Sequence, residues 1–260
     1  VSGYIYGLRG DGTNAFWRYD IDANTWLARA NAPANVKNGG ALVWLNGYCY
    51  ALGGNGTTNF WRYDPVANTW TATGVMASTP QNVKDGGALT TDGTYIYAFR
   101  GDRKMDFWRY DVSANTWTAM ASAPANIGQG GSLVYQSGYI YALRGDGKNN
   151  FYRYDIAANT WSAMTNAPAN VKQGGALTTD GTYIYATQGN GKKLFWRYSP
   201  AANSWTALAQ TSQNVGYGGA LAYVPPFGAQ YRSTSLAVDH SLVTTGDQFT
   251  LTMTLSSTVV

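Results

Sequence analysis

Five copies of one short aromatic motif recur along this 260-residue chain. The copies repeat at a period of roughly 44 residues, read Phe-Trp-Arg-Tyr-Asp or a close variant, and begin at Phe16, Phe60, Phe107, Phe151 and Phe195. A Trp follows the Tyr of each copy at one fixed distance, giving Trp26, Trp70, Trp117, Trp161 and Trp205. A period of this length indicates stacked supersecondary units that cannot bury their faces alone.

The composition favours short strands over helices. Aromatic residues make up 15% of the chain, Gly occurs 31 times, and every acidic residue is Asp. Because Tyr, Trp, Thr and Val favour strands whereas Glu and Lys favour helices, we predict an all-β fold. The net charge is +4, but the sequence contains no long run of Lys or Arg residues, so no nucleic-acid partner is predicted. No apolar stretch reaches the length of a membrane span.

One repeat resolves into four short strands. Residues 130–135 read as a first strand, 139–143 as a second with alternating side chains, 151–155 as a third and 160–163 as a fourth. The Asp146-Gly147 pair predicts a tight hairpin between the second and third strands, because both residues tolerate positive φ. Four antiparallel strands that are apolar on both faces are typical of a propeller blade.

The two ends of the repeat region complete each other. The chain opens at residues 3–6, which match the second strand of a blade, and the missing first strand matches residues 218–223. We therefore predict a five-bladed β-propeller over residues 1–224, closed by N- and C-terminal strands in one blade. Residues 225–260 are predicted to form a Pro linker and a short β-rich extension. The first residue is Val, so we expect a processed product from which a signal peptide was removed.

The repeat resembles that of kelch proteins over residues 1–224. The kelch signature places a double Gly at the end of the second strand, followed by a Tyr and a Trp, as in Gly53-Gly54, Tyr63 and Trp70. Other copies replace the first Gly, as in Arg144-Gly145, so the chain resembles a divergent kelch-like propeller. The resemblance implies either a protein-binding module or one of the family's few enzymes, and the fold alone does not decide between them.

Polar residues gather on one face of the predicted ring. The fourth-to-first connections and the second-to-third hairpins share this face, whose mouth opens onto the central channel. The predicted mouth residues are Asn35, Lys37, Asn82, Lys84, Asn126, Asn170, Lys172 and Asn214, with Arg9, Arg100 and Arg144 from the hairpins. One interpretation is a site for a glycan or an anionic ligand. The other is that each Asn closes its own loop by bonding to local backbone.

Each third strand carries an Arg, with an Asp two residues later in four of the five copies, as in Arg18 and Asp20. We predict structural ion pairs packed against aromatic rings. The single cysteine, Cys49, occupies a position that is Ile in three other repeats, so it is predicted to be a small buried hydrophobe.

Catalytic residues are scarce. His240 is the only histidine and lies outside the repeats, which excludes a Ser-His-Asp triad and His/Cys metal sites within them. We therefore predict no enzyme, cofactor or metal. The more distant alternative is an Asp-dependent glycosidase. Every Asp candidate recurs as a turn or strand-end residue of the repeat, and Asp85 and Asp102 come closest to an isolated acid near the channel.

The pattern changes after Pro225-Pro226. Residues 248–255 alternate strictly and place four apolar side chains on one strand face: Phe249, Leu251, Met253 and Leu255. Residues 246–250 resemble the start of bacterial surface Ig-like domains, which implies a location outside the cell. Either the rest of such a domain is missing, or these strands pair with another chain and form a homo-oligomer.

From these features we predict a non-catalytic extracellular or cell-surface module for binding or scaffolding. The alternative is a structural subunit of an extracellular filament or surface array, assembled through residues 227–260.

Overall fold

The computed structural model describes residues 3–223 and contains five antiparallel sheets with no helix. The first blade holds β1 (Tyr4–Leu8), β2 (Phe16–Asp20) and β3 (Thr25–Ala28). The second holds β4 (Ala41–Leu45), β5 (Tyr48–Leu52), β6 (Phe60–Asp64) and β7 (Thr69–Trp70). The third holds β8 (Ala88–Thr91), β9 (Tyr95–Phe99), β10 (Phe107–Asp111) and β11 (Thr116–Ala119).

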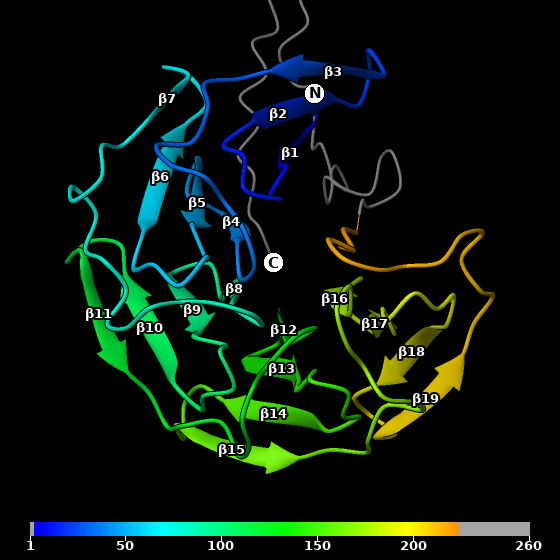
Figure 1. Cartoon of the computed structure of the whole chain (residues 1–260). Coiled ribbons are helices and arrows are strands. Elements are labelled where there is room, and N and C mark those ends of the chain that lie inside the picture. Colours follow the sequence, from blue (N-terminus) through cyan, green and yellow to red (C-terminus); the bar gives the residue numbers. More distant parts are fainter. Residues whose placement is uncertain (1–2, 224–260) are drawn as a thin grey trace, which may run out of the picture. The chain divides into compact units, whose positions relative to one another are not determined.

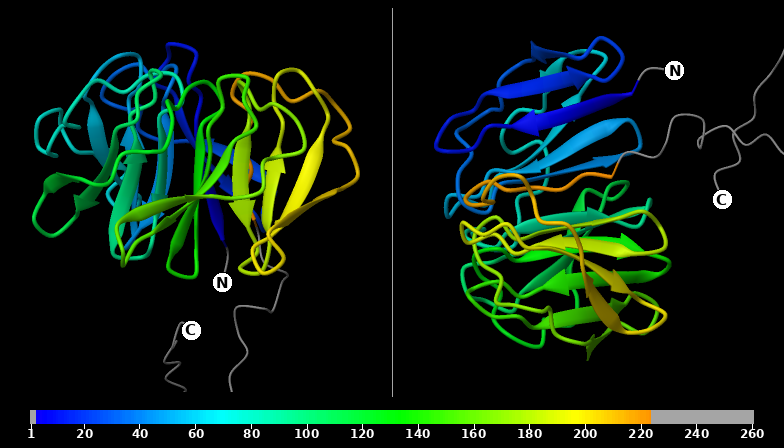
Figure 2. Two further views of the ribbon diagram at one scale, coloured as in Figure 1. Left: turned by 90° about the horizontal axis from the view of Figure 1, so that it is seen from below. Right: turned by 90° about the vertical axis from the view of Figure 1, so that its right-hand side faces the viewer.

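The fourth blade holds β12 (Ser132–Gln136), β13 (Tyr139–Leu143), β14 (Phe151–Asp155) and β15 (Thr160–Ala163). The fifth holds β16 (Ala176–Thr179), β17 (Ile184–Thr187), β18 (Phe195–Ser199) and β19 (Ser204–Ala207). Figure 1 shows the blades arranged as a propeller, with β4, β8, β12 and β16 innermost. Figure 2 shows the strands running between two faces made of loops. The predicted all-β, five-bladed fold is confirmed.

The fourth blade follows the sequence prediction closely. Strands β13, β14 and β15 have the predicted bounds, and β12 is shifted by a residue or two. In the predicted hairpin, Asp146 has φ 55° and Gly147 has φ 71°, the left-handed backbone that such a turn requires. Alternating side chains and Asp-Gly turn chemistry were therefore sufficient to locate the strands.

The first blade differs from the prediction in one respect. It has three strands, and among residues 3–223 no segment pairs with the free edge of β1. Residues 220–223 form no strand, so the predicted closing strand is not seen. This pairing would close a loop spanning almost the whole described chain with a short ladder, which makes it the costliest contact of the ring in chain entropy.

Aromatic clusters between neighbouring blades form the core. Phe107 of the third blade packs edge-on against Tyr154 and Trp161 of the fourth, with ring centroids 4.9 and 5.0 Å apart. The same contacts recur between the first and second, second and third, and fourth and fifth blades. Such edge-to-face pairs add to the burial of large rings. The repeated motif is therefore the inter-blade core.

Cys49 is buried, as predicted, with 2% of its surface exposed. Burial in this apolar setting raises the pKa of its thiol to about 12.

The third-strand arginines pack on tyrosines but do not pair with the aspartates that follow them. Arg153 lies 4.4 Å from the ring centroid of Tyr139, and the other four blades repeat this contact. Asp155 instead accepts the backbone N–H of Ala158 at 3.0 Å within its turn. The predicted ion pairs are wrong, because the carboxylate serves the turn that follows the strand.

Residues 224–260 lie outside the described residues, so the predicted assembly side chains Phe249, Leu251, Met253 and Leu255 remain predictions.

Candidate functional site at the channel mouth

The hairpins and the inter-blade connections lie together on one side of the ring, as predicted. Each second-to-third hairpin forms an isolated bridge with the connection to the next blade, as between Lys148 and Val171 or Thr13 and Val36. All five hairpins make this contact. We call this side of the ring the mouth face.

Within four blades, the incoming connection is also fastened to that blade's own hairpin. The N–H of Asp146 donates to the carbonyl oxygen of Gln129 at 2.8 Å, and that of Asp102 donates to Asp85 at 2.8 Å. Asn55 and Asn190 make the same bond to Asn38 and Gln173. The accepting residue always stands directly before a Gly-Gly pair. We call Asn38, Asp85, Gln129, Gln173 and the equivalent Tyr217 the mouth ring.

Close backbone packing explains the glycines beside the mouth ring. A Cβ at Gly145 would lie 2.4 Å from the carbonyl oxygen of Gln129, and one at Gly130 would lie 1.9 Å from that of Lys172 in the next blade. Contacts this short exclude any side chain. The glycines therefore let the blades converge on the axis, and they hold the mouth-ring backbone in one geometry.

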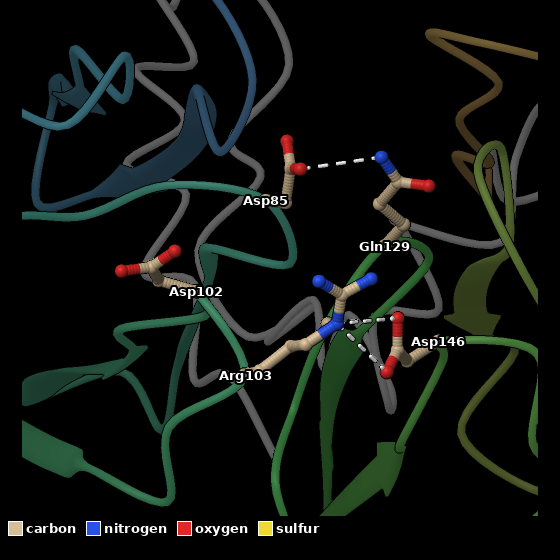
Figure 3. A pocket seen from close by; sticks show the side chains of 6 residues that line it. Asp85, Asp102, Arg103, Gln129 and Asp146 are labelled. Atoms are coloured by element: carbon tan, nitrogen blue, oxygen red, sulfur yellow. Dashed lines mark hydrogen bonds and ion pairs between the residues drawn. The ribbon is translucent and has the colours of Figure 1, made fainter.

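The side chains of the mouth ring differ in chemical type from blade to blade, although the backbone that carries them repeats. Figure 3 shows Gln129 reaching across to Asp85, with its Nε2 donating to the carboxylate at 3.2 Å. Beside this pair, Nε of Arg103 donates to both carboxylate oxygens of Asp146 at 3.1 Å. Asp102 and Gly128 complete the lining of a pocket of about 20 Å³. This is room for one water molecule, so a larger ligand would lie across the mouth rather than inside it.

Arg103 departs from the repeat. The equivalent residues are Gly12, Gly56, Gly147 and Gly191, all with positive φ, and Arg103 adopts the same left-handed backbone at φ 55°. A non-glycine residue in this conformation is strained by ~1 kcal/mol. Hydrogen bonding to Asp146 and its negative charge raise the pKa of Arg103. An exposed, strained arginine that breaks a repeat is a feature that packing does not explain.

Two further side-chain oxygens on the mouth face are buried without a partner among residues 3–223. Gln188 is 8% exposed, and its Nε2 donates to the carbonyl oxygen of Asn170 at 3.0 Å. Its Oε1 has no partner among residues 3–223, and neither does Oε1 of Gln173. A buried amide oxygen without a hydrogen bond is costly. Gln173 belongs to the mouth ring, whereas Gln188 lies farther out, at the place that Arg144 takes beside Asn126 in the fourth blade.

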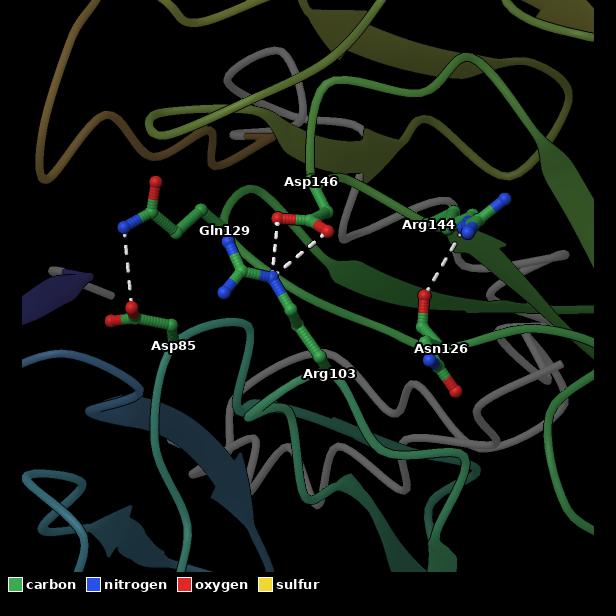
Figure 4. A network of polar contacts seen from close by, with 6 residues as sticks. All are labelled: Asp85, Arg103, Asn126, Gln129, Arg144 and Asp146. Atoms are coloured by element: carbon green, nitrogen blue, oxygen red, sulfur yellow. Dashed lines mark hydrogen bonds and ion pairs between the residues drawn. The ribbon is translucent and has the colours of Figure 1, made fainter.

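The predicted asparagines lie farther out on the mouth face. Asn35, Asn82, Asn126, Asn170 and Asn214 are all exposed. None of these side chains bonds to local backbone within the part of the chain that the structure describes. Their carbonyl groups are used instead, since Nε of Arg144 donates to Asn126 at 3.1 Å, and Arg100 bonds to Asn82 in the same way. Figure 4 shows Asn126 and Arg144 apart from the Arg103–Asp146 and Asp85–Gln129 pairs.

The basic residues of the prediction are also at the surface. Arg9, Lys37 and Lys84 are exposed, and Lys172 is half-buried. Arg100 pairs with Asp106 at 3.0 Å, and Arg144 with the side-chain oxygen of Asn150 at 3.0 Å, so these two are occupied on their own hairpins. The mouth ring itself was missed, apart from Asp85. Its signal in the sequence is the residue before each Gly-Gly pair, which changes in chemical type from blade to blade.

A larger pocket lies beside the incomplete first blade. It has a volume of about 470 Å³ and is lined by Tyr4, Tyr6, Arg18, Trp44, Pro65 and Val66. Tyr6 is half-buried there, as is its equivalent Tyr185 of the fifth blade, whereas Tyr50, Tyr97 and Tyr141 are buried. This pocket therefore occurs where the first blade lacks its inner strand.

Within residues 3–223, no group of three or more His, Cys, Asp or Glu side chains is placed to hold a metal ion. Nor does that part of the chain contain a helix that is long and apolar enough to cross a membrane.

Comparison with known proteins supports the fold. No family model matches the chain, and no curated protein matches it. Among solved structures, the one described as "Structure of YjhT" is similar, with a TM-score of 0.64 and 16% identity, over 83% of each chain. At this identity the likeness shows the β-propeller fold alone, and the kelch resemblance stays a prediction from the repeat motif.

Proposed function

We propose that this chain is a non-catalytic binding module whose mouth ring holds a polyhydroxylated ligand such as a glycan. The observation that carries the proposal is the contrast between a repeated backbone and unrepeated side chains at one place. Four blades present the mouth ring through the same hydrogen bond, yet the side chains presented are Asn38, Asp85, Gln129 and Gln173. A symmetric scaffold gains no stability from such variation.

The chemistry of the ring suits hydroxyl groups. Amides offer donors and acceptors side by side, and each carboxylate has two acceptor oxygens. Arg103, fixed by Asp146, adds a directed donor at the rim.

Many other aspartates already serve the fold. Asp64 and Asp111 each accept backbone N–H groups of the third-to-fourth turn, and Asp180 accepts those of Thr182 and Tyr183. Three acids of the mouth face, Asp85, Asp102 and Asp146, line the pocket where a ligand would meet them, and Asp11 is exposed on the same face. The location outside the cell is part of the proposal and rests on the resemblance of residues 246–250, outside the described residues.

The test is a binding titration of the full chain with neutral hexaoses of glucose, mannose, galactose and N-acetylglucosamine. We expect one class to bind, and Asp85→Asn or Gln129→Ala to weaken that binding at least tenfold. Asp22→Asn is the matched control, because Asp22 is exposed in a turn of the opposite face. Equal binding by all variants, or no binding of any probe, would refute the proposal.

A further inference from the structure

Four of the five neighbouring blade pairs share the same contacts, and the pair formed by the fifth and first blades does not. In the four pairs, a Trp Nε1 donates to a carbonyl oxygen of the preceding blade, as Trp205 does to Thr165 at 2.9 Å. Trp26 holds this position in the first blade and is 59% exposed. Its equivalent acceptor is the carbonyl group of Ala209. The aromatic core is interrupted too, because Phe195 is half-buried whereas Phe16, Phe60, Phe107 and Phe151 are buried.

Two glycines mark the same seam on the mouth face. In four blades the hairpin glycine lies against the mouth-ring carbonyl oxygen, as Gly54 does against Asn38. Gly10 has the same backbone, with φ 68°, but no atom lies within 4 Å of its Cβ position. Gly218 likewise has nothing within 4 Å, whereas its equivalents Gly39, Gly86, Gly130 and Gly174 meet the backbone of the next blade. Gly10 therefore has room for a mouth-ring carbonyl oxygen and Gly218 for the backbone of the next blade, but neither contact is made.

The segment that would make these contacts already has the required conformation. The N–H of Gly219 donates to the carbonyl oxygen of Gly216 at 3.1 Å, the bond that closes this turn in all four other blades. Gly218 has φ 77°, close to the 83–88° of its four equivalents. The turn is therefore formed before it has a partner, which lowers the entropy cost of docking.

The sequence predicts that residues 218–223 supply the missing strand of this blade. From these observations we propose that residues 216–223 dock there and place Tyr217 as the fifth member of the mouth ring. By equivalence with the other blades, the N–H of Asp11 would donate to the carbonyl oxygen of Tyr217, and Ala220–Tyr223 would pair with Leu8–Ile5. This pairing supplies the inner strand whose place beside Tyr6 is now part of the larger pocket.

Tyr217 also refines the ligand class, a step that rests on the proposed function. It is 77% exposed and is the one aromatic member of the mouth ring, beside amides and a carboxylate. An aromatic face offers an apolar surface for the C–H side of a pyranose ring, while the neighbouring amides and Asp85 bond to its hydroxyls. The docked ring is therefore complementary to a neutral pyranoside rather than to an anion.

Docking is tested by a matched pair of glycine substitutions in the full chain. Gly10 and Gly56 have φ 68° and 70°, and neither has an atom within 4 Å of its Cβ position. Backbone strain is therefore equal in Gly10→Ala and Gly56→Ala, but only the Cβ at position 10 would meet a docked Tyr217 carbonyl group. We expect Gly10→Ala to lower the Tm by several degrees more than Gly56→Ala. Equal Tm changes would overturn docking.

Amide hydrogen exchange of the unmodified chain is a second, independent test of docking. The Asp11 N–H should be protected to the same extent as that of Asp146, which has a carbonyl partner. Exchange of Asp11 at the rate of a free amide would overturn docking, even if Gly10→Ala fails to fold.

The proposed contact between Tyr217 and the ligand is tested by titrating Tyr217→Ala and Tyr217→Phe with the four hexaoses. We expect at least tenfold weaker binding for Tyr217→Ala and near-normal binding for Tyr217→Phe. If Tyr217→Ala binds normally while Gln129→Ala does not, the role of Tyr217 is wrong and the proposed function stands. If the unmodified chain binds no hexaose, the proposed function and the ligand class fall, and the glycine pair still decides docking.

Discussion

The hydroxyl of Tyr154 donates to the side-chain oxygen of Asn159 at 2.7 Å, and this oxygen also accepts the N–H of Ala121 from the preceding blade at 2.9 Å. One amide therefore joins a buried aromatic ring, its own turn and the neighbouring blade. Tyr63, Tyr110 and Tyr198 repeat the arrangement with Asn68, Asn115 and Asn203. Coupling between blades is thus carried by a polar contact as well as by ring packing.

Replacing Asn159 with Gly should destabilise the propeller. The left-handed backbone at φ 55° accepts Gly, so the loss reflects the missing oxygen rather than strain. Two hydrogen bonds, one from a buried tyrosine, are worth about 1–3 kcal/mol of unfolding free energy. Asn46→Gly is the control, since Asn46 has φ 49° and lies in a turn without such a bond. Guanidinium unfolding measures both, and similar losses would show that the oxygen is unimportant.

Replacing Arg103 with Gly should separate binding from stability. Gly relieves the left-handed strain, and an exposed ion pair contributes little, so the unfolding free energy should be kept or slightly raised. Binding of the hexaose that the chain recognises should weaken, because the directed donor at the mouth is lost. Arg103→Lys is the comparison, because it keeps the charge and the backbone strain but loses the planar set of guanidinium N–H donors. A variant with unchanged affinity would remove Arg103 from the site.

The buried tyrosines predict a loss of stability at alkaline pH. Burial raises the pKa of Tyr110, Tyr154 and Tyr198 from 10.0 to about 12. A raised pKa of a neutral acid favours the folded state below pH 10, and this advantage is lost as the pH rises from 10 to 12. The guanidinium midpoint should therefore fall across this range. Tyrosine absorbance that titrates entirely near pH 10 without unfolding would contradict the prediction.

Cys49 should report opening of the second blade. With 2% exposure and a pKa of about 12, the thiol is both inaccessible and protonated at neutral pH. Ellman's reagent should therefore label it only as fast as the protein opens, and the rate should increase steeply with denaturant. Labelling at the rate of a free thiol in buffer would show that this part of the core is open.

The strands could be predicted because each depends on local patterns. Alternating aromatic residues and the Asp146-Gly147 turn located β13 and β14, and repetition extended the result to all blades. The Arg–Asp pairs were predicted wrongly, because spacing along a strand does not show that Asp155 bonds to its own turn. The mouth ring was missed because Gln129 and Gln173 lie in loops, where proximity to the axis depends on how five blades pack together. Each of these residues stands directly before a Gly-Gly pair, but this position indicates a place at the mouth only once the close backbone contacts of the glycines are known.

The central claim is that the mouth ring is the ligand-binding site. Amide chemical-shift mapping of the full chain during titration with the four hexaoses tests it most directly. The account predicts shifts centred on Asn38, Asp85, Gln129, Gln173 and Tyr217, with none in the turns of the opposite face around Asp64 and Asp155. Shifts confined to that opposite face, or none with any hexaose, would contradict it.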